Sequence, residues 1–203
     1  YIKTSKNILF EGNGYGDEWE IEAKRRGLSN NKTTPDALKA RVSKKTISLF
    51  EELGVMNKVE IEARYEIEIE EYALRIQIEG RVLGDIARNH IIPTAIIYQN
   101  TLLENTKNLK EIFGEEYKNI AKEQIELIMI ISNHITEINS LSVKMIDERR
   151  KANKHAALKC AEMYCKNVKP FLDQIRYHCD KLETMVDDNL WPLTKYRELL
   201  FTR

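Results

Sequence analysis

The sequence is poor in the residues that interrupt helices. It contains four prolines and eight glycines in 203 residues, whereas Glu, Lys, Leu and Ile are abundant. Because Pro and Gly are the residues that helix interiors tolerate least, this composition favours helix throughout. No apolar run approaches the ~18 residues that a membrane-spanning helix needs, so we expect no membrane segment.

The chain also lacks an excess of charge. Lys plus Arg number 32 and Asp plus Glu number 32, so the formal net charge is zero. Nucleic-acid-binding domains carry a basic excess, and we therefore expect neither a nucleic-acid partner nor a membrane-surface partner. The three cysteines form no C-x-x-C pair, and no signal peptide opens the chain, which together indicate a reduced, cytoplasmic setting. Since the first residue is Tyr1 and not Met, we expect a piece of a longer protein.

Three of the eight glycines fall within five positions near the N-terminus. Gly12, Gly14 and Gly16 separate an apolar run from a helix start at Asp17. A dinucleotide-binding loop has the spacing G-x-G-x-x-G, whereas here the third glycine comes one residue early and no P-loop Lys-Ser or Lys-Thr follows. Asp17 and Glu18 also occupy the helix N-terminus, where a bound anion would lie. We interpret the stretch as a turn with positive φ angles; a nucleotide-binding loop is the alternative.

Capping signals predict short helices before residue 57. Ser43 and Thr34 are N-cap candidates, the latter followed by Pro35 at the first helical position, and Gly27 and Gly54 are C-terminal stops. We expect an extended segment at residues 8–10 and helices at residues 17–26, from Thr34 onward, and at residues 44–53.

From about Val59 apolar residues recur every three or four positions, which predicts long helices. The first should run to residue 92, kink or break at Pro93 and continue to residue 113. It carries a second apolar face, so we expect neighbours on both sides; this face comprises Ile67, Leu74, Ile78 and Val82.

Two further long helices are predicted, at residues 115–151 and from about Lys154, where Pro170 should introduce a bend. The last carries a four-three seam typical of coiled coils, formed by Ala161, Cys165, Val168, Leu172, Ile175, Cys179, Leu182 and Val186. The predicted fold is all-α: a long antiparallel helical bundle preceded by a short extended segment and small helices. We divide the chain into a linker-like entry (1–56), the bundle (57–189) and a docking tail (190–203) with the apolar run Leu199-Leu200-Phe201.

Candidate chemical groups do not assemble into a recognisable site. The acidic residues of the first long helix have no His three positions later, which a di-metal helix bundle would require; we interpret them as a solvated face, with metal binding as the alternative. They are Glu60, Glu62, Glu66, Glu68, Glu70 and Glu71. The four histidines lie far apart without ligand spacing, and we expect surface or core roles for them: His90, His134, His155 and His178.

The cysteines and the basic clusters also have simple interpretations. Cys165 and Cys179 lie on the seam as small hydrophobic residues, and Cys160 lies off it without an assigned role. The clusters at residues 24–26 and 148–151 stand near helix C-termini, where cations suit the helix dipole; a specific anion site is the alternative. We assign no catalytic, cofactor-binding or metal-binding residue.

Read as a whole, the sequence resembles the C-terminal region of type III glutamine synthetases. The resemblance spans nearly the whole chain and is weakest between residues 100 and 159. It departs from the family at Gly80, where Ala is expected. The motifs that carry it are Phe10-Glu11-Gly12-Asn13-Gly14-Tyr15, Glu18-Trp19, Glu22-Ala23, Arg26-Gly27-Leu28, Thr33-Thr34-Pro35, Arg64-Tyr65-Glu66-Ile67, Glu70-Glu71-Tyr72, Ile76-Gln77-Ile78-Glu79, Ile91-Ile92-Pro93, Leu182-Glu183-Thr184, Trp191-Pro192 and Tyr196.

The resemblance implies a parent enzyme that joins ammonia to glutamate with ATP and Mg or Mn ions. The metal-binding and catalytic residues of that family belong to its upstream catalytic domain, and no position here matches them. The resemblance therefore implies a non-catalytic helical extension whose partners are the upstream catalytic domain and the other subunits of a homo-oligomer. An independent helical scaffold or protein-interaction module is the alternative.

Overall fold

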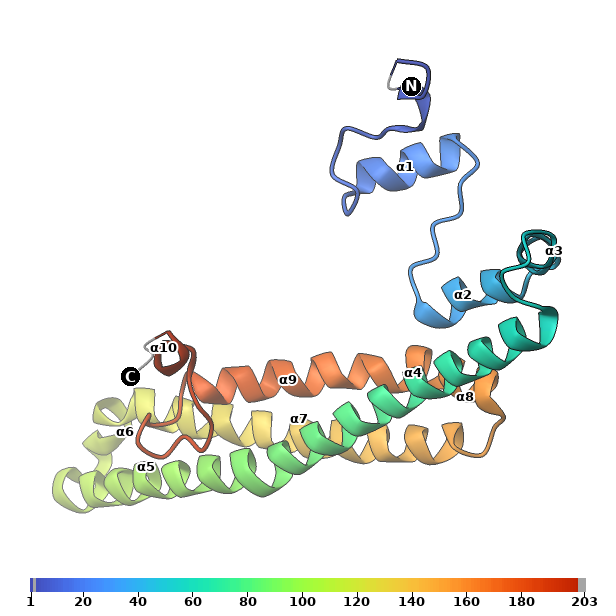
Figure 1. Cartoon of the computed structure of the whole chain (residues 1–203). Coiled ribbons are helices and arrows are strands. Elements are labelled where there is room, and N and C mark those ends of the chain that lie inside the picture. Colours follow the sequence, from blue (N-terminus) through green and yellow to red (C-terminus); the bar gives the residue numbers. More distant parts are fainter. Residues whose placement is uncertain (2, 201–203) are drawn as a thin grey trace. The chain divides into compact units, whose positions relative to one another are not determined.

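The computed structural model describes residues 1 and 3–200 (Figure 1). Every regular element among them is helical, which confirms the all-α prediction. The chain divides into two compact units, Tyr1–Tyr65 and a second unit that begins at Glu66. Phe201 of the predicted tail lies outside the described residues.

The first unit contains short, capped elements. They are η1 (Lys6–Ile8), α1 (Asp17–Arg25), α2 (Thr34–Lys39), η2 (Ala40–Val42), α3 (Lys44–Glu52) and the start of α4 (Lys58–Ile86). Gly27 and Gly54 end α1 and α3 with φ angles of 69° and 64°, as predicted. The left-handed turn at Gly27 lets the Leu28 amide donate to the Ala23 carbonyl, closing the last turn of α1.

Two local predictions in this unit were wrong. Residues 8–10 are not one extended segment, because Ile8 ends a 3₁₀ turn and the extended backbone begins at Leu9. The N-cap of α2 is Thr33 instead of Thr34. The Thr33 hydroxyl accepts a hydrogen bond from the Asp36 amide, at 3.4 Å, which moves Pro35 to the second helical position, where a missing N–H costs nothing.

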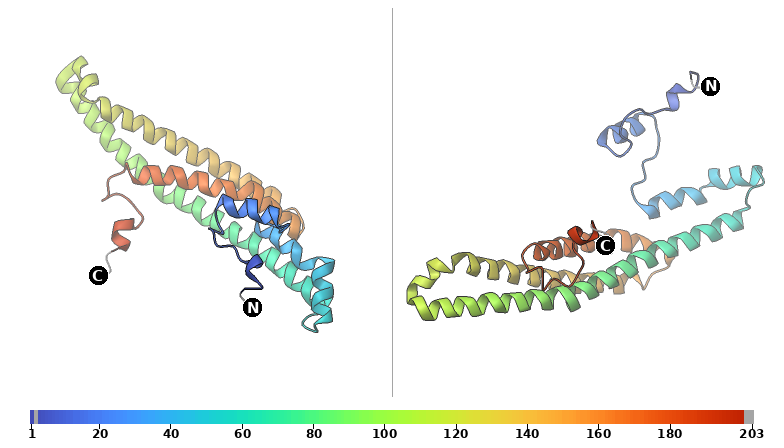
Figure 2. Two further views of the ribbon diagram at one scale, coloured as in Figure 1. Left: turned by 90° about the horizontal axis from the view of Figure 1, so that it is seen from above. Right: turned by 60° about the vertical axis from the view of Figure 1, so that its left-hand side comes forward.

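The second unit is built from long helices that run antiparallel to one another (Figures 1 and 2). After α4 the chain forms η3 (Ala87–Ile91), α5 (Ile92–Phe113), η4 (Gly114–Glu116), α6 (Tyr117–Ile120) and α7 (Lys122–Ala152). It returns through α8 (Ala157–Met163), η5 (Tyr164–Val168) and α9 (Lys169–Glu183), and α10 (Tyr196–Leu199) follows. Helix α7 packs against both α5 and α9, so the antiparallel bundle was predicted correctly.

Pro93 and Pro170 interrupt the long helices in the same way. Each is the second residue after a π-helical turn: η3 ends at Ile91 before Pro93, and η5 ends at Val168 before Pro170. The Ile92 amide donates to the carbonyl of Ala87, five residues earlier. A proline ring clashes with the carbonyl four residues before it and offers no N–H, and a wider turn relieves both problems. The break predicted at Pro93 is therefore confirmed.

The predicted helix 115–151 is not continuous. A 3₁₀ turn and the short α6 come first, and Ala121, with φ −96° and ψ 12°, separates α6 from α7. Ala121 is fully buried. The hydrophobic period continues through this break, which is why the sequence pattern did not reveal it.

The core lies between α7 and α9. Ile131, Ile138 and Met145 of α7 are fully buried, as are Ile175 and Leu182 of α9. All eight seam residues are buried or half-buried, as the four-three spacing predicted. Fully buried Tyr164, which the pattern missed, donates a hydrogen bond from its hydroxyl to Asn153 Oδ1 at 2.8 Å.

The tail is anchored by Trp191, which is 9% exposed. Lys195 holds the chain in place, because its Nζ donates to the Glu183 carbonyl at 3.1 Å and pairs with Asp188. Leu199 and Leu200 remain exposed.

Candidate functional site

The glycine-rich stretch is shaped by aromatic packing. The Phe10 and Trp19 rings pack with their centroids 5.1 Å apart. A Cβ atom on Gly12 would lie 2.6 Å from Phe10 Cζ, so a larger residue there would have to displace the end of the Phe10 ring. Gly12, Gly14 and Gly16 do not have positive φ angles, and that part of the prediction was wrong. Gly16 instead caps α1 in an extended conformation.

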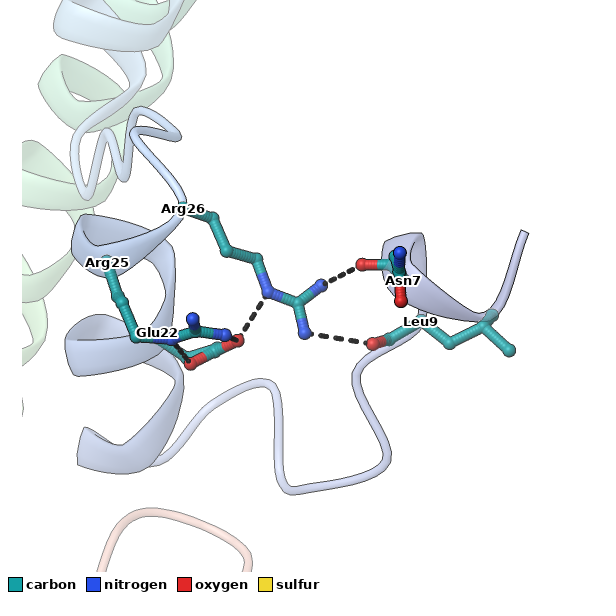
Figure 3. Close-up of polar contacts among 5 residues, drawn as sticks. All are labelled: Asn7, Leu9, Glu22, Arg25 and Arg26. Atoms are coloured by element: carbon teal, nitrogen blue, oxygen red, sulfur yellow. Dashed lines mark hydrogen bonds and ion pairs between the residues drawn. The ribbon is translucent and has the colours of Figure 1, made fainter. Parts of the chain in front are cut away.

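The basic cluster at residues 24–26 acts within the first unit (Figure 3). Arg25 donates two hydrogen bonds to the Glu22 carboxylate, at 2.6 and 2.7 Å, and Arg26 donates a third at 2.5 Å. The same Arg26 guanidinium donates to the carbonyls of Asn7 and Leu9, at 3.2 and 3.0 Å. The bonds from Arg25, then those from Arg26, lower the pKa of Glu22 to about 2. Arg26 therefore fastens the N-terminal segment to α1, and Arg25 helps to hold the Glu22 carboxylate.

The acidic residues of α4 serve local purposes. Glu60 and Asn57 cap the helix reciprocally, because the Asn57 amide donates to the Glu60 carboxylate at 2.8 Å and the Glu60 amide donates to Asn57 Oδ1 at 3.0 Å. In the second unit, Glu71 pairs with Arg75 at 2.7 Å, and Glu66 and Glu70 are exposed. Across the described residues, no group of three or more His, Cys, Asp or Glu side chains is placed to hold a metal ion.

Two histidines that looked unrelated in the sequence lie together. His134 of α7 and His178 of α9 face each other with their Nδ1 atoms 2.8 Å apart. One ring must donate and the other accept, so the bond requires at least one neutral imidazole. Burial, followed by the nearby His178 and Lys181, lowers the pKa of His134. His134 lies three positions after the buried Ile131, and His178 lies three positions after the seam residue Ile175; this shared spacing could have paired them. His90 and His155 are exposed.

The three cysteines are free thiols, and each is buried or half-buried. Cys179 is buried on the seam, and burial, with a smaller effect from Asp180, raises its pKa to about 12. Cys160 and Cys165 are half-buried, and burial also raises the pKa of the Cys160 thiol. Because the thiolate is the nucleophilic form, these shifts lower the reactivity of Cys160 and Cys179.

The second apolar face of α4 is exposed and not sandwiched as predicted. Its exposed fractions are 63% for Ile67, 53% for Leu74 and 51% for both Ile78 and Val82. We call these four residues the α4 stripe. The other face of α4 packs into the core of the second unit, and Ile69 and Ile76 on that face are buried. A row of large apolar side chains on a surface is typical of a protein-interaction face.

Comparisons with known proteins identify the family. The sequence model of the family described as the glutamine synthetase C-terminal domain matches residues 1–110 of the chain. The chain belongs to this family. It is 45% identical to a glutamine synthetase of Bacteroides fragilis (strain YCH46) over 204 residues, which covers 100% of the chain and 28% of that relative. It is 31% identical to a type-3 glutamine synthetase of Dictyostelium discoideum over 201 residues, covering 97% of the chain and 27% of the relative.

The glutamine synthetase resemblance noted in the sequence is therefore confirmed, and the match with the Dictyostelium protein supports its type. A glutamine synthetase of Butyrivibrio fibrisolvens is 29% identical over 202 residues, with 28% of its length covered. The chain thus spans somewhat more than a quarter of the relatives that it matches. Within the described residues, no helix has the length and apolarity to cross a bilayer.

Proposed function

We propose that this chain is the assembly-forming helical part of a cytoplasmic glutamate–ammonia ligase. The parent enzyme would use ATP to activate the γ-carboxylate of glutamate and would join ammonia to it, with Mg or Mn ions neutralising the transferring phosphoryl group. Support comes from the family match and from relatives that carry the glutamine synthetase name.

The residues present here do not fit ATP or its metal ions. The stretch that holds Gly12, Gly14 and Gly16 lacks the spacing of a phosphate loop, and its first glycine faces the Phe10 ring. The described carboxylates and histidines form no ligand cluster. We therefore place the chemistry in the upstream catalytic domain and derive no catalytic step from this chain.

The observation that carries the proposal is the exposed α4 stripe. Isolated exposed apolar residues are ordinary on protein surfaces, but a row along one helix face is costly to leave in water. Full burial of an exposed side chain of this kind contributes roughly 1.5–3 kcal/mol, and the four stripe residues, already partly covered, would each gain about half of that. We infer that another subunit of a homo-oligomer covers the stripe, and that the upstream catalytic domain holds this region in place.

The test places a charge in the stripe of the full-length enzyme. Leu74→Asp and Ile78→Asp should each shift the assembly toward smaller oligomers in mass photometry, because a carboxylate is expensive to bury at an interface. Asn100→Asp is the matched control, since Asn100 is exposed on α5 outside the stripe. If both stripe variants assemble like the control at all concentrations tested, the stripe is not an assembly surface.

A further inference from the structure

A cavity of about 340 Å³ lies between α4, η3 and α7 in the second unit. Its size is at the lower end of the range of small-molecule sites. Gly80 and Gly84, one helical turn apart on α4, form part of its wall. Because they lack side chains, the surface of α4 is hollowed where Met145 of α7 approaches, at 3.5 Å from a Cβ built on either glycine.

Three arginines line this cavity: Arg81 from α4, Arg88 from the π-helical turn η3, and Arg149 from α7. Arg81 and Arg88 are seven residues apart, close to two helical turns, so both lie on the side of α4 and η3 that faces the cavity. Within the part of the chain that the structure describes, none of the three has an ion-pair partner. The two basic residues that follow Arg149 on α7 are locally paired instead, Arg150 with Asp147 and Lys151 with Glu148.

Arg149 is the most informative of the three. Its Nε atom is buried and has no hydrogen-bond partner among the described residues. A buried guanidinium N–H without an acceptor is costly, and native structures rarely leave one in this state. The described residues supply no acceptor for this atom, which leaves ordered water or a ligand as its partner.

The charge of the cavity indicates what kind of acceptor it is. One carboxylate, Asp85, shares the lining, and it already accepts a hydrogen bond from Asn89 at 2.5 Å. Three guanidinium groups and one carboxylate leave a local charge of +2. Guanidinium groups bind planar or tetrahedral oxyanions through paired N–H donors.

We propose that this arginine cavity is a binding site for a small dianion with oxygen acceptors, either a phosphoryl group or a dicarboxylate. Arg81 and Arg88 hold the anion from the α4 and η3 side, and Arg149 contributes its guanidinium group from α7. The ligand would thereby bridge α4 to α7 next to η3. This inference does not rest on the proposed assembly role, and its test uses neither oligomer size nor catalytic turnover.

The test is hydrogen–deuterium exchange of the full-length protein, read in the peptides that cover residues 80–91 and 145–152. The probes are inorganic phosphate and succinate, each compared with chloride at the same ionic strength. We expect saturable protection of these peptides by at least one probe. Phosphate alone, succinate alone or both would support the site and define its ligand class. Because exchange is compared in these two peptides alone, protection there distinguishes binding in this cavity from binding at any anion site in the catalytic domain.

Three variants make the result specific. Arg149→Gln should raise the half-saturating concentration of the anion by about tenfold or more, because it removes a charge-assisted donor. The double variant Arg81→Gln/Arg88→Gln should do the same, and both residues are exposed, so folding is preserved. Arg75→Gln is the control, since Arg75 is exposed on α4 outside the cavity and should change affinity less than about twofold. Absence of protection by both probes, equal protection by chloride, or equal binding by all variants would overturn the proposal.

Discussion

Ile175 of α9 offers the most direct test of the bundle core. Its side chain is completely buried on the seam that faces α7. Ile175→Ala removes three buried carbon atoms, a transfer loss of roughly 2.4 kcal/mol at about 0.8 kcal/mol per carbon. The cavity left behind adds to this loss, so we expect a total destabilisation of about 3–4 kcal/mol.

Ile97→Ala on α5 is the matched control, because it removes the same three carbons from a helical residue outside the α4 stripe that is 54% exposed. The gain in helix propensity is the same in both variants, so the difference between them isolates burial. The assay is urea unfolding of the 203-residue chain followed by helical circular dichroism. We expect the control to lose less than about 1 kcal/mol. Equal losses in the two variants would refute the assignment of the seam to the core.

Three further predictions concern the same bundle. Gly80→Ala should raise the free energy of unfolding by about 0.5–1 kcal/mol, because alanine favours helix and its Cβ would meet its nearest neighbours at an ordinary 3.5 Å. A lower free energy of unfolding in urea would contradict this. Ser142→Ala should be neutral or stabilising by up to about 1–2 kcal/mol, since the Ser142 hydroxyl is buried without a partner among the described residues; thermal unfolding that shows a clear loss would reveal a hidden acceptor. The pKa of His134 is lowered in the fold, so as the pH falls the unfolded chain takes up this proton before the folded one. The free energy of unfolding should therefore decrease as the pH drops below 6.5, the ordinary pKa of histidine. His134→Gln should flatten this pH dependence between about pH 7.5 and 5, and an unchanged slope would exclude His134 as its cause.

The sequence pattern predicted the elements that depend on interactions between residues close together in the chain. Gly27, Gly54 and Gly114 end helices where expected, since a positive φ is needed there and glycine supplies it. The seam from Ala161 to Val186 was visible because its period is unbroken. The break at Ala121 left the period intact and was therefore missed.

The functional surfaces depend on contacts between helices, which the sequence does not encode locally. His134 and His178 are 44 residues apart and meet only because α7 and α9 pack together. Arg149 reads as one member of a basic run, and only the fold brings it to Arg81 and Arg88. The α4 stripe was recognised as apolar, but its exposure follows from the absence of a covering helix among the described residues, which periodicity alone cannot show.

The central claim is that this chain contributes assembly and not chemistry to a glutamine synthetase. The measurement that tests it most directly is γ-glutamyl transfer by the purified 203-residue chain, with Mg-ATP or Mn-ADP, beside the full-length enzyme. We predict no turnover by the chain and normal turnover by the full-length enzyme. Turnover by the chain that saturates with substrate would contradict the account.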